Sequence, residues 1–475
     1  MLVVGIVYTS SAADSILNLR HGKGHFVTAL KNCVQEHPIL STVITDGATE
    51  TPGFATTTIL DLEKHIEIRE FVDSSEDVSI EKALAQVSDE QFSSVESIPP
   101  WKVVLVPLPR EDHSGNSRLL ALFAYYHSHG DGKSGLAFHR SFFRGLNMSP
   151  SEDNVPTKFS CEAPETALLP PIEQAGKLSL SWSFLLSPLL GAYLPSFLAR
   201  MFGFRASYTT QDDDIWRGHD LTFDADNFCT GLVLRTIEHG TMRRVLQSCK
   251  ARQATFTGVF NQIIARSLSA ALGASSSANG FASQIVVDMR QLIGGIFNED
   301  SMTNCVTAYN ETIADQDLTQ QSDWATNPSS PFWAAARKTS AGLADTAGTL
   351  HNQPIGLLQY LNAFRPWTLE QIGKKREISY EISNLVVFDP KGSKQPEPSG
   401  ENSIAIEKTI FSQPANAAGA LLNFNLVSTK GGPLVMTVTW QLGVLDLLEG
   451  PENAFVQEVC ENIKAKLQEL AHVGV

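Results

Sequence analysis

The stretch ALFAYYHSHGDGKSGLAFHRSFFRGLN, residues 121–147, decides the fold that the sequence predicts. An apolar run over residues 119–126, rich in aromatic and aliphatic side chains, predicts a buried strand. The six residues that follow, HSHGDG, contain two glycines and an aspartate and therefore predict a tight loop. Ser134 is a suitable N-cap, so we expect a helix over residues 135–146. The stretch thus predicts a strand, a polar loop and a helix in succession.

The predicted loop presents His127 at the end of a rigid strand. A histidine side chain titrates near neutral pH and can take a proton from a hydroxyl group or an amine. We expect the bend to turn Asp131 away from any pocket, so that its carboxylate holds local structure through charge-assisted hydrogen bonds. Gly132 is expected to supply the backbone angles that the bend needs.

The pattern His127-x-x-x-Asp131-Gly132 resembles the HxxxDG signature of the chloramphenicol acetyltransferase-like superfamily. That superfamily includes plant acyltransferases, peptide-synthetase condensation domains and alcohol acetyltransferases. The continuation SGLAFHR is similar to a helix of the fungal alcohol acetyltransferase family. Residues 29–44 and 255–272 also resemble helical segments of this family.

The resemblance implies an α/β fold with two lobes, each a mixed sheet flanked by helices, and an active-site tunnel between them. The chain has 475 residues, which suits such a fold. We expect an N-terminal lobe over residues 1–175, an apolar connector over 176–220 and a C-terminal lobe over 221–475. Hydrophobic periodicity and caps predict helices over 25–37, 76–90, 241–251, 258–272, 332–351 and 451–472 and a short helix over 357–364. They predict strands over 2–8, 39–44, 56–68, 101–107, 232–237, 284–287, 378–388, 404–411, 421–429 and 434–442.

A second element of the site follows the strand predicted over residues 284–287. The sequence there reads Asp288-Met289-Arg290. In the superfamily a D-x-R at this point supplies an arginine that pairs with the motif aspartate. The resemblance therefore implies that Arg290 binds Asp131 bidentately and locks the motif loop. The alternative is a surface arginine at the end of a strand.

A third element lies in the strand predicted over residues 378–388. Ser383-Asn384-Leu385 resembles the SNLG segment of alcohol acetyltransferases, with Val386 in place of the glycine. The resemblance implies that Ser383 and Asn384 donate hydrogen bonds to a thioester oxygen or to the cofactor. The alternative is that they satisfy the end of a strand. Val386 makes the backbone bulkier at this point than glycine would.

Several classes of protein are disfavoured. The formal net charge of −15 argues against a nucleic-acid binder. The six cysteines have no CxxC spacing, so we expect free thiols in a reducing compartment. His127 and His129 are spaced for chelation, but no cluster of further ligands accompanies them, and we expect no metal. The hydrolase elbow GxSxG and the phosphate loop GxxxxGK[ST] are both missing. His129 and His139 are expected to be structural.

The segment 178–199, LSLSWSFLLSPLLGAYLPSFLA, contains no charged residue. Its length permits a membrane span, but Pro188, Pro195 and its serines argue against one. Two other interpretations stay open: an interfacial or substrate-channel helix pair, and an apolar connector packed across the lobes. We expect at most weak membrane association through 178–199. The N-terminus lacks the basic region of a secretory signal, so we expect a cytoplasmic protein.

The resemblance implies an acyl-CoA-dependent O-acyltransferase, most specifically an O-acetyltransferase. It would move the acyl group from CoA to a hydroxyl of a lipophilic alcohol or secondary metabolite, with His127 as general base. The sequence contains no recognisable activated serine or cysteine, so we expect no covalent acyl-enzyme intermediate. We expect acyl-CoA and a small-molecule acceptor as the partners, acetyl-CoA as co-substrate, no permanently bound cofactor, and a monomer. Two alternatives stay open: a condensation-type or N-acyltransferase that uses a carrier-protein thioester or an amine, and a non-catalytic family member.

Overall fold

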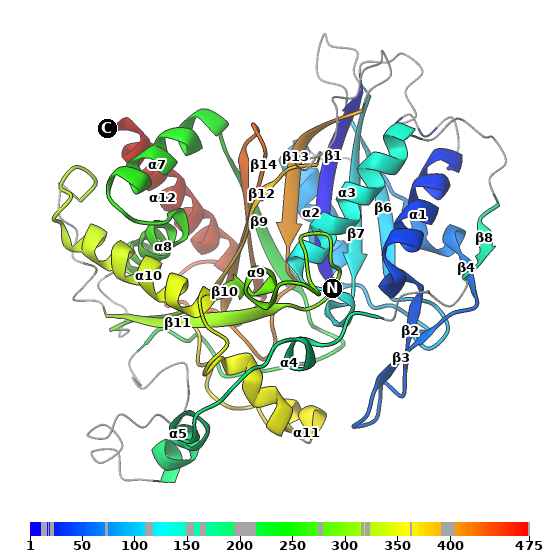
Figure 1. Cartoon of the computed structure of the whole chain (residues 1–475). Coiled ribbons are helices and arrows are strands. Elements are labelled where there is room, and N and C mark those ends of the chain that lie inside the picture. The colour runs from blue at the N-terminus through cyan, green and yellow to red at the C-terminus, as the bar shows by residue number, and fades with distance from the viewer. Residues whose placement is uncertain are drawn as a thin grey trace.

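The computed structural model describes most of the chain, and all structural statements below concern the described part. This part comprises residues 1–10, 17, 19, 23–71, 75–109, 117–148, 156–161, 168–193, 215–273, 279–314, 318, 324–361, 363–390 and 404–473. The described residues form two lobes, each built on a mixed sheet with helices packed against it (Figure 1).

The first lobe is built on a five-stranded sheet in the order β13-β1-β7-β6-β5 (Figure 1). Only β5 and β6 are parallel among its neighbouring strands. The central strand β7 is buried along its whole length, and its alternate side chains enter two different core clusters, one on each face of the sheet. Burial of both faces explains why its sequence is a continuous apolar run. The strands are β1 (Leu2–Ser10), β5 (Ile66–Ile68), β6 (Trp101–Leu108), β7 (Ser117–Tyr125) and β13 (Ala405–Ser412).

Three helices cover this sheet. On one face lie α1 (Gly24–Glu36) and α3 (Gly132–Met148), and on the other lies α2 (Glu76–Asp89). The aromatic ring of Phe138 on α3 stacks on that of Phe123 on β7 with centroids 3.7 Å apart. This packing fixes the position of α3 relative to β7, and hence the loop that joins them.

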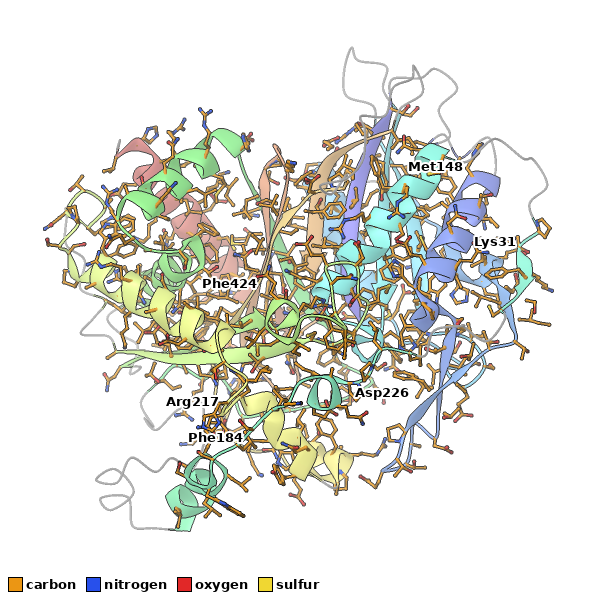
Figure 2. All side chains as sticks on the ribbon, viewed as in Figure 1. Lys31, Met148, Phe184, Arg217, Asp226 and Phe424 are labelled. Atoms are coloured by element: carbon orange, nitrogen blue, oxygen red, sulfur yellow. The ribbon has the colours of Figure 1, made fainter. Side chains whose placement is uncertain are left out.

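The second lobe is built on a six-stranded sheet in the order β11-β10-β12-β14-β15-β9. Strand β12 is parallel to both of its neighbours, and the other pairs are antiparallel. Phe424 on β14, labelled in Figure 2, is fully buried in the core between this sheet and its helices. The strands are β9 (Thr230–Ile237), β10 (Gly280–Asp288), β11 (Val306–Ala314), β12 (Tyr380–Phe388), β14 (Leu422–Thr429) and β15 (Leu434–Gln441).

Helices of the second lobe pack on the sheet face that lies away from the first lobe (Figure 1). Helix α8 begins after Thr255, whose side chain caps the helix by accepting a hydrogen bond from the Gly258 N–H. The opposite face of the sheet is left to face the first lobe. The helices are α7 (His239–Ala251), α8 (Phe256–Leu272), α10 (Pro331–Ala347) and α12 (Glu452–His472).

Strand β13 joins the two sheets. It comes late in the chain but pairs antiparallel with β1, so it forms the edge of the first sheet. It also contacts the second sheet, because the hydroxyl groups of Thr409 and Thr429 lie 2.9 Å apart and the Thr437 hydroxyl donates to the Phe411 carbonyl over 2.7 Å. The first sheet therefore depends on residues that follow most of the second lobe in sequence.

Several predicted elements differ in detail. The strand predicted over 39–44 begins as a 3-10 turn, η2 (Pro38–Ser41), before β2 (Thr42–Thr45), because Pro38 favours a turn at its start. The strand predicted over 56–68 is divided by η3 (Leu62–His65), which Asp61 caps by accepting from the Glu63 N–H. Its other parts are β3 (Gly53–Thr56), β4 (Ile59–Asp61) and β5.

Elements around the second lobe also differ from prediction. The helix predicted over 332–351 ends at Ala347, and the short helix expected over 357–364 is replaced by η6 (Pro354–Tyr360) and α11 (Phe364–Leu369). Neither β11 nor the short helix α9 (Arg290–Ile293) is predicted from the sequence. Strand β11 has the sequence VTAYNETIA, in which three consecutive polar residues interrupt the apolar ones, so its hydrophobic periodicity is a weak strand signal.

The apolar segment 178–199 is described only up to residue 193. It contains α5 (Trp182–Tyr193), while residues 194–199 lie outside the described part. The Ser181 N–H donates to the Asn352 side chain over 2.8 Å, which attaches the start of α5 to the second lobe. In the ranges that the structure describes, no helix is both long enough and apolar enough to cross a bilayer. Before this segment the chain forms β8 (Lys158–Ser160), which pairs antiparallel with β4, and the short helix α4 (Ile172–Ala175).

Candidate active site

His127 stands at the point where β7 ends and the chain turns toward α3. It opens a 3-10 turn, η4 (His127–His129), and its side chain is exposed to a cavity. Its carbonyl oxygen accepts a hydrogen bond from the Asn304 side chain over 2.5 Å. Because Asn304 belongs to the second lobe, the backbone that carries His127 is held from both sides of the cavity.

The cavity lies between the lobes and has a volume of about 540 Å³. The first lobe contributes His127 and Lys133, and the second contributes residues of β10 and β12, including Gln284, Glu381 and Ser383. Part of its rim is apolar and comes from η6 and α11, with Leu358 and Trp367 among the lining residues. A ligand in this cavity would therefore contact both lobes at once.

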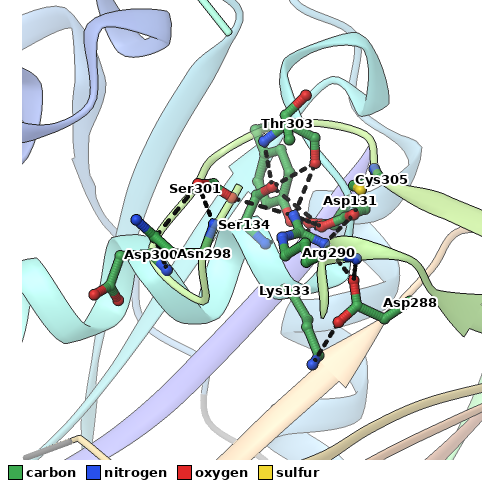
Figure 3. A network of polar contacts seen from close by, with 11 residues as sticks. Asp131, Lys133, Ser134, Asp288, Arg290, Asn298, Asp300, Ser301, Thr303 and Cys305 are labelled. Carbon is green, nitrogen blue, oxygen red and sulfur yellow. Dashed lines mark hydrogen bonds and ion pairs between the residues drawn. The ribbon is translucent and has the colours of Figure 1, made fainter. Parts of the chain in front are cut away.

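Asp131 and Arg290 form a buried, bidentate ion pair across the lobes (Figure 3). Both contacts between guanidinium nitrogen and carboxylate oxygen measure 2.8 Å, and the side chains are only 4% and 2% exposed. Two parallel charge-assisted bonds fix both distance and orientation. The structure thus brings together the two residues that the resemblance pairs.

Arg290 also ties down the loop that follows it. Its guanidinium group donates to the carbonyl oxygens of Ser301 and Thr303 and to the Asp288 carboxylate. Burial alone would lower the pKa of Arg290, but the charges of Asp131 and Asp288 raise it above its usual value. The guanidinium group therefore stays charged and keeps the loop 288–305 against the motif.

Asp288 is shared between two cations. Its carboxylate accepts from Arg290 over 2.9 Å and from Lys133, on the first turn of α3, over 2.8 Å (Figure 3). Burial would raise the pKa of Asp288, but these two cations together hold it below its ordinary value. Asp288 and Lys133 both line the cavity, so this end of it carries a neutralised pair.

Asp131, and not Ser134 as predicted, caps helix α3. The helix begins at Gly132, and the Asp131 carboxylate accepts from both the backbone N–H and the hydroxyl group of Ser134, each over 3.1 Å. A carboxylate at this position accepts the free N–H groups of the first turn and interacts favourably with the helix dipole. The Cys305 N–H completes its shell at 3.0 Å.

Gly132 has a different role from the one predicted. It has helical backbone angles, so the bend does not require a glycine for its conformation. A β-carbon there would lie 2.7 Å from the Leu385 side chain and 2.9 Å from the Phe411 ring. A glycine is thus needed at position 132 because Leu385 of the second lobe occupies the space that a side chain would fill.

Strand β12 is irregular beside the candidate donors. Its register against β14 shifts between Asn384 and Val387, and Val386 has a φ angle of 67°. The Asn384 side chain accepts from the Val386 N–H over 2.9 Å and donates to the Thr257 hydroxyl over 3.1 Å. The Asn384 side-chain oxygen and one of its N–H groups are thus already engaged in hydrogen bonds at the bulge. Ser383 is 6% exposed, lines the cavity and has no hydrogen-bond partner for its hydroxyl among the described residues.

The other histidines of the motif are buried. His129 lies between the Thr42 hydroxyl and carbonyl groups, and His139 contacts the Tyr8 hydroxyl over 3.0 Å and the Val4 carbonyl over 2.9 Å. Burial lowers the pKa of each of these two histidines to about 4. No metal-ligand cluster of histidine, cysteine and acidic side chains occurs within the described ranges.

Sequence reasoning missed two residues of the site. Asn304, which holds the His127 carbonyl, lies in a loop whose sequence carries no signal for this contact. Glu381 lines the cavity from β12, and burial raises its pKa despite opposing effects of Gln413 and the His127 charge. A glutamate between the apolar residues Tyr380 and Ile382 of the predicted strand was a visible signal, because such a charge needs a partner or a function.

The chain is similar to known proteins over most of its length. The model of the alcohol acetyltransferase family matches residues 61–457. The probable alcohol acetyltransferase FCK4 of Fusarium pseudograminearum is 22% identical over 441 residues, covering 90% of this chain and 84% of that protein. The probable alcohol acetyltransferase crmB of Aspergillus fumigatus is 21% identical over 459 residues, covering 92% and 89%.

Solved structures share the fold. The TRI3 trichothecene 15-O-acetyltransferase from Fusarium sporotrichioides has a TM-score of 0.68 at 15% identity, covering 100% of this chain and 91% of that one. The condensation domain of the monacolin K polyketide synthase MokA has a TM-score of 0.55 at 10% identity, covering 99% and 92%. The predicted two-lobed fold is thereby confirmed. Because the family model spans most of its length, the chain belongs to the alcohol acetyltransferase family and is an acetyltransferase.

Proposed function

We propose that this chain transfers an acetyl group from acetyl-CoA to a hydroxyl group of a lipophilic alcohol, with His127 as general base. The observation that carries the proposal is a histidine exposed in a cavity between two lobes, on a backbone held from both of them. A volume of about 540 Å³ lies within the usual range for small-molecule sites. Both substrates are proposed to meet in this cavity at the His127 imidazole.

The proposed reaction is a direct transfer. The His127 imidazole takes the proton of the acceptor hydroxyl while the hydroxyl oxygen bonds to the thioester carbonyl carbon. The tetrahedral intermediate then collapses, the carbon–sulfur bond breaks, and the imidazolium returns the proton to the CoA thiolate. The products are an ester and free CoA. No acyl-enzyme forms, because no serine or cysteine of the site is assigned as a nucleophile.

Asp131 is proposed to fix the loop and not to relay protons. Its carboxylate accepts from Arg290, Ser134 and Cys305, and none of these bonds involves His127. We expect Asp131→Asn to reduce stability as well as rate. A fully stable Asp131→Asn variant with a rate loss as large as that of His127→Ala would contradict this role.

Ser383 is the better of the two proposed donors to the oxyanion. Its hydroxyl has no partner within the described residues, whereas the Asn384 amide is engaged with Val386 and Thr257. A donor preorganised toward the developing negative charge stabilises the transition state more than the ground state. Asn384 is therefore proposed to shape the bulge that presents Ser383.

A lipophilic acceptor is proposed from the apolar rim of the cavity. Ile355, Leu358 and Trp367 line it, and Leu358 and Trp367 are 42% and 46% exposed. Apolar side chains at a cavity rim gain free energy when a ligand covers them. We further propose that the enzyme acts on cytoplasmic acetyl-CoA.

The test is a product assay with the wild type and His127→Ala. Each protein is incubated with acetyl-CoA and a panel of lipophilic alcohols and amines, and products and free CoA are measured by mass spectrometry. We expect ester and CoA in equal amounts from the wild type and loss of both in the variant. Amide products, or turnover only after a carrier-protein thioester replaces acetyl-CoA, would favour a condensation-type reaction instead.

A further inference from the structure

A row of polar side chains runs across neighbouring strands, and three of its members line the cavity. Gln284 on β10 and Glu381 on β12 are directly paired across the two strands, and both line the cavity. The Gln284 amide donates to Asn310 on β11 over 3.2 Å. Gln413, just beyond β13, also lines the cavity and donates to Glu381 over 2.9 Å. We call these four side chains the polar row: Asn310, Gln284, Glu381 and Gln413.

The polar row differs from its surroundings on the same sheet face. Two residues further along the same strands, the cavity is lined by Val286 and Ser383. Since a strand rises about 3.3 Å per residue, the polar row lies roughly 7 Å from Ser383 along β12. The polar row is thus displaced from the proposed oxyanion donor, Ser383, by about the length of a few carbon–carbon bonds.

The Glu381 carboxyl group is only partly satisfied by the protein. The two N–H groups of the Gln413 amide donate to Glu381 Oε1 and to Asn425 Oδ1, which lies 3.0 Å away. In the described part of the chain, Gln413 is the one hydrogen-bond partner of the Glu381 carboxyl group, which leaves Oε2 open. Gln413 is therefore fixed in orientation, and it holds Glu381 in place without saturating it.

An open carboxyl oxygen constrains what can bind beside it. When a ligand displaces water from the cavity, Oε2 loses its hydration, which costs free energy unless the ligand supplies a hydrogen-bond donor. Burial already raises the pKa of Glu381, which reflects the same cost of removing water from the charge. A purely hydrocarbon acceptor would impose this cost, whereas a second hydroxyl group would remove it.

We propose that Glu381 binds a second hydroxyl group of the acceptor, so that the enzyme selects lipophilic alcohols with at least two hydroxyl groups. This inference rests on the proposed function, because it concerns the acceptor of the same reaction. The first hydroxyl reacts at His127 near Ser383, and the second donates to Glu381 Oε2. Gln413 acts as the positioning residue that holds the carboxyl group toward the cavity.

The experiment compares three acceptors of one chain length: decan-1-ol, decane-1,4-diol and 4-methoxydecan-1-ol. With the wild type and acetyl-CoA, we expect kcat/KM for the diol to exceed that for decan-1-ol roughly 10- to 100-fold, because a hydrogen bond to a charged group is gained. The methoxy compound has the same added oxygen without a proton, so it should resemble decan-1-ol. This series tests the wild type alone and needs no variant to fold.

The matched variants are Glu381→Gln and Glu311→Gln. Glu381→Gln keeps an oxygen for Gln413 but presents an amide N–H to the cavity, so it should reduce the diol preference several-fold and improve the methoxy compound. Glu311 is a buried carboxyl group on β11 that accepts from Asn261 and Thr339 and lies outside this cavity. Glu311→Gln should leave the diol preference unchanged.

Three outcomes would overturn the inference. One is equal turnover of all three acceptors by the wild type, which leaves acetyl transfer intact but removes the second hydroxyl from recognition. Another is an increase of KM for acetyl-CoA in Glu381→Gln that is the same with every acceptor, which assigns Glu381 to the co-substrate. A third is a uniform loss of rate with a lower melting temperature and an unchanged diol preference, which assigns it a structural role. No transfer to any alcohol would instead contradict the proposed function itself.

Discussion

The two lobes face the cavity with walls of opposite character. The wall of the first lobe is the motif loop, whose Asp131 carboxylate accepts five hydrogen bonds and is almost fully buried. The wall of the second lobe is β12, which is bulged, places Val386 at a φ angle of 67° and leaves Glu381 partly unsatisfied. Because the hydrogen bonds around Asp131 support one another, they hold the wall of the first lobe in a single geometry.

The difference suggests a division of labour. The proposed general base lies on the fixed wall, because a base must stay within hydrogen-bond reach of the proton that it takes. The proposed acceptor contacts lie on the irregular wall, where strain and open polar groups persist. The predictions below test whether the two walls differ in this way, from the largest expected effect to the smallest.

The largest effect is expected for His127→Ala. Because His127 is exposed and its side chain makes no hydrogen bond with the described residues, the variant should fold normally while kcat falls by about 10²- to 10⁴-fold. Steady-state kinetics with a turned-over alcohol measures this. His472→Ala, at an exposed position near the end of α12, is the control and should retain full activity. If His127→Ala retained its activity, His127 would not be the general base, and the proposed role of the first wall would be wrong.

Arg290→Met tests the rigidity of the first wall. It leaves the Asp131 carboxylate buried without its cation, so the free energy of unfolding should fall by about 3–5 kcal/mol in a urea titration. Arg144→Met breaks a more exposed pair with Glu36, and should cost at most about 1 kcal/mol. If the free energy of unfolding fell by similar amounts in both variants, the buried Asp131–Arg290 pair would not make the first wall more rigid than the rest of the surface.

Acidification should weaken the first lobe selectively. Burial lowers the pKa of His65, His129 and His139 to about 4, partly offset by hydrogen bonds to backbone carbonyls. In the unfolded chain a histidine titrates near 6.5, so the unfolded state binds more protons between these values. Stability is therefore fully present above pH 6.5 and is lost as the pH falls toward 4, by up to about 3 kcal/mol per histidine.

Urea unfolding at pH 7.5 and pH 5 measures this loss, and hydrogen exchange locates it. In the described part of the second lobe no histidine is buried, so exchange in the first sheet should accelerate more on acidification. His129→Gln should make the loss smaller, whereas His472→Gln, at an exposed site, should not change it. Equal acceleration of exchange in both sheets would contradict the assignment to buried histidines.

The smallest effect is expected for Val386→Gly in the second wall. A β-branched residue at a φ angle of 67° is strained, and glycine adopts this conformation freely, so we expect a gain of about 1 kcal/mol in the free energy of unfolding. Val387→Gly is the matched control, since Val387 is similarly exposed and has no positive φ angle. It should lower stability. A loss in both variants would show that the bulge is not a site of strain.

The parts of the site that sequence reasoning predicted are those with a local chemical signature. The HxxxDG pattern and the D-x-R pattern identified His127, Asp131 and Arg290, and the structure brings Asp131 and Arg290 together. The strand and helix around the motif were also predicted, because burial of both sheet faces makes β7 a continuous apolar run.

The parts that were missed depend on contacts between distant segments. Ser134 and Asp131 are both good caps, and the choice between them is set by Arg290 and Cys305 from the second lobe. Gly132 is explained only by Leu385 and Phe411 packing against it. No local pattern encodes such approaches, because each depends on how the lobes meet.

The position of β13 has a consequence for synthesis of the chain on the ribosome. Residues 405–412 supply the edge strand of the first sheet, so β1 keeps an unpaired edge until most of the polypeptide has been made. An open strand edge is a template for pairing with other chains. The nascent first lobe thus has a long interval of exposure to aggregation and to chaperones. A fragment that stops before residue 405 should remain poorly folded, however complete its HxxxDG motif.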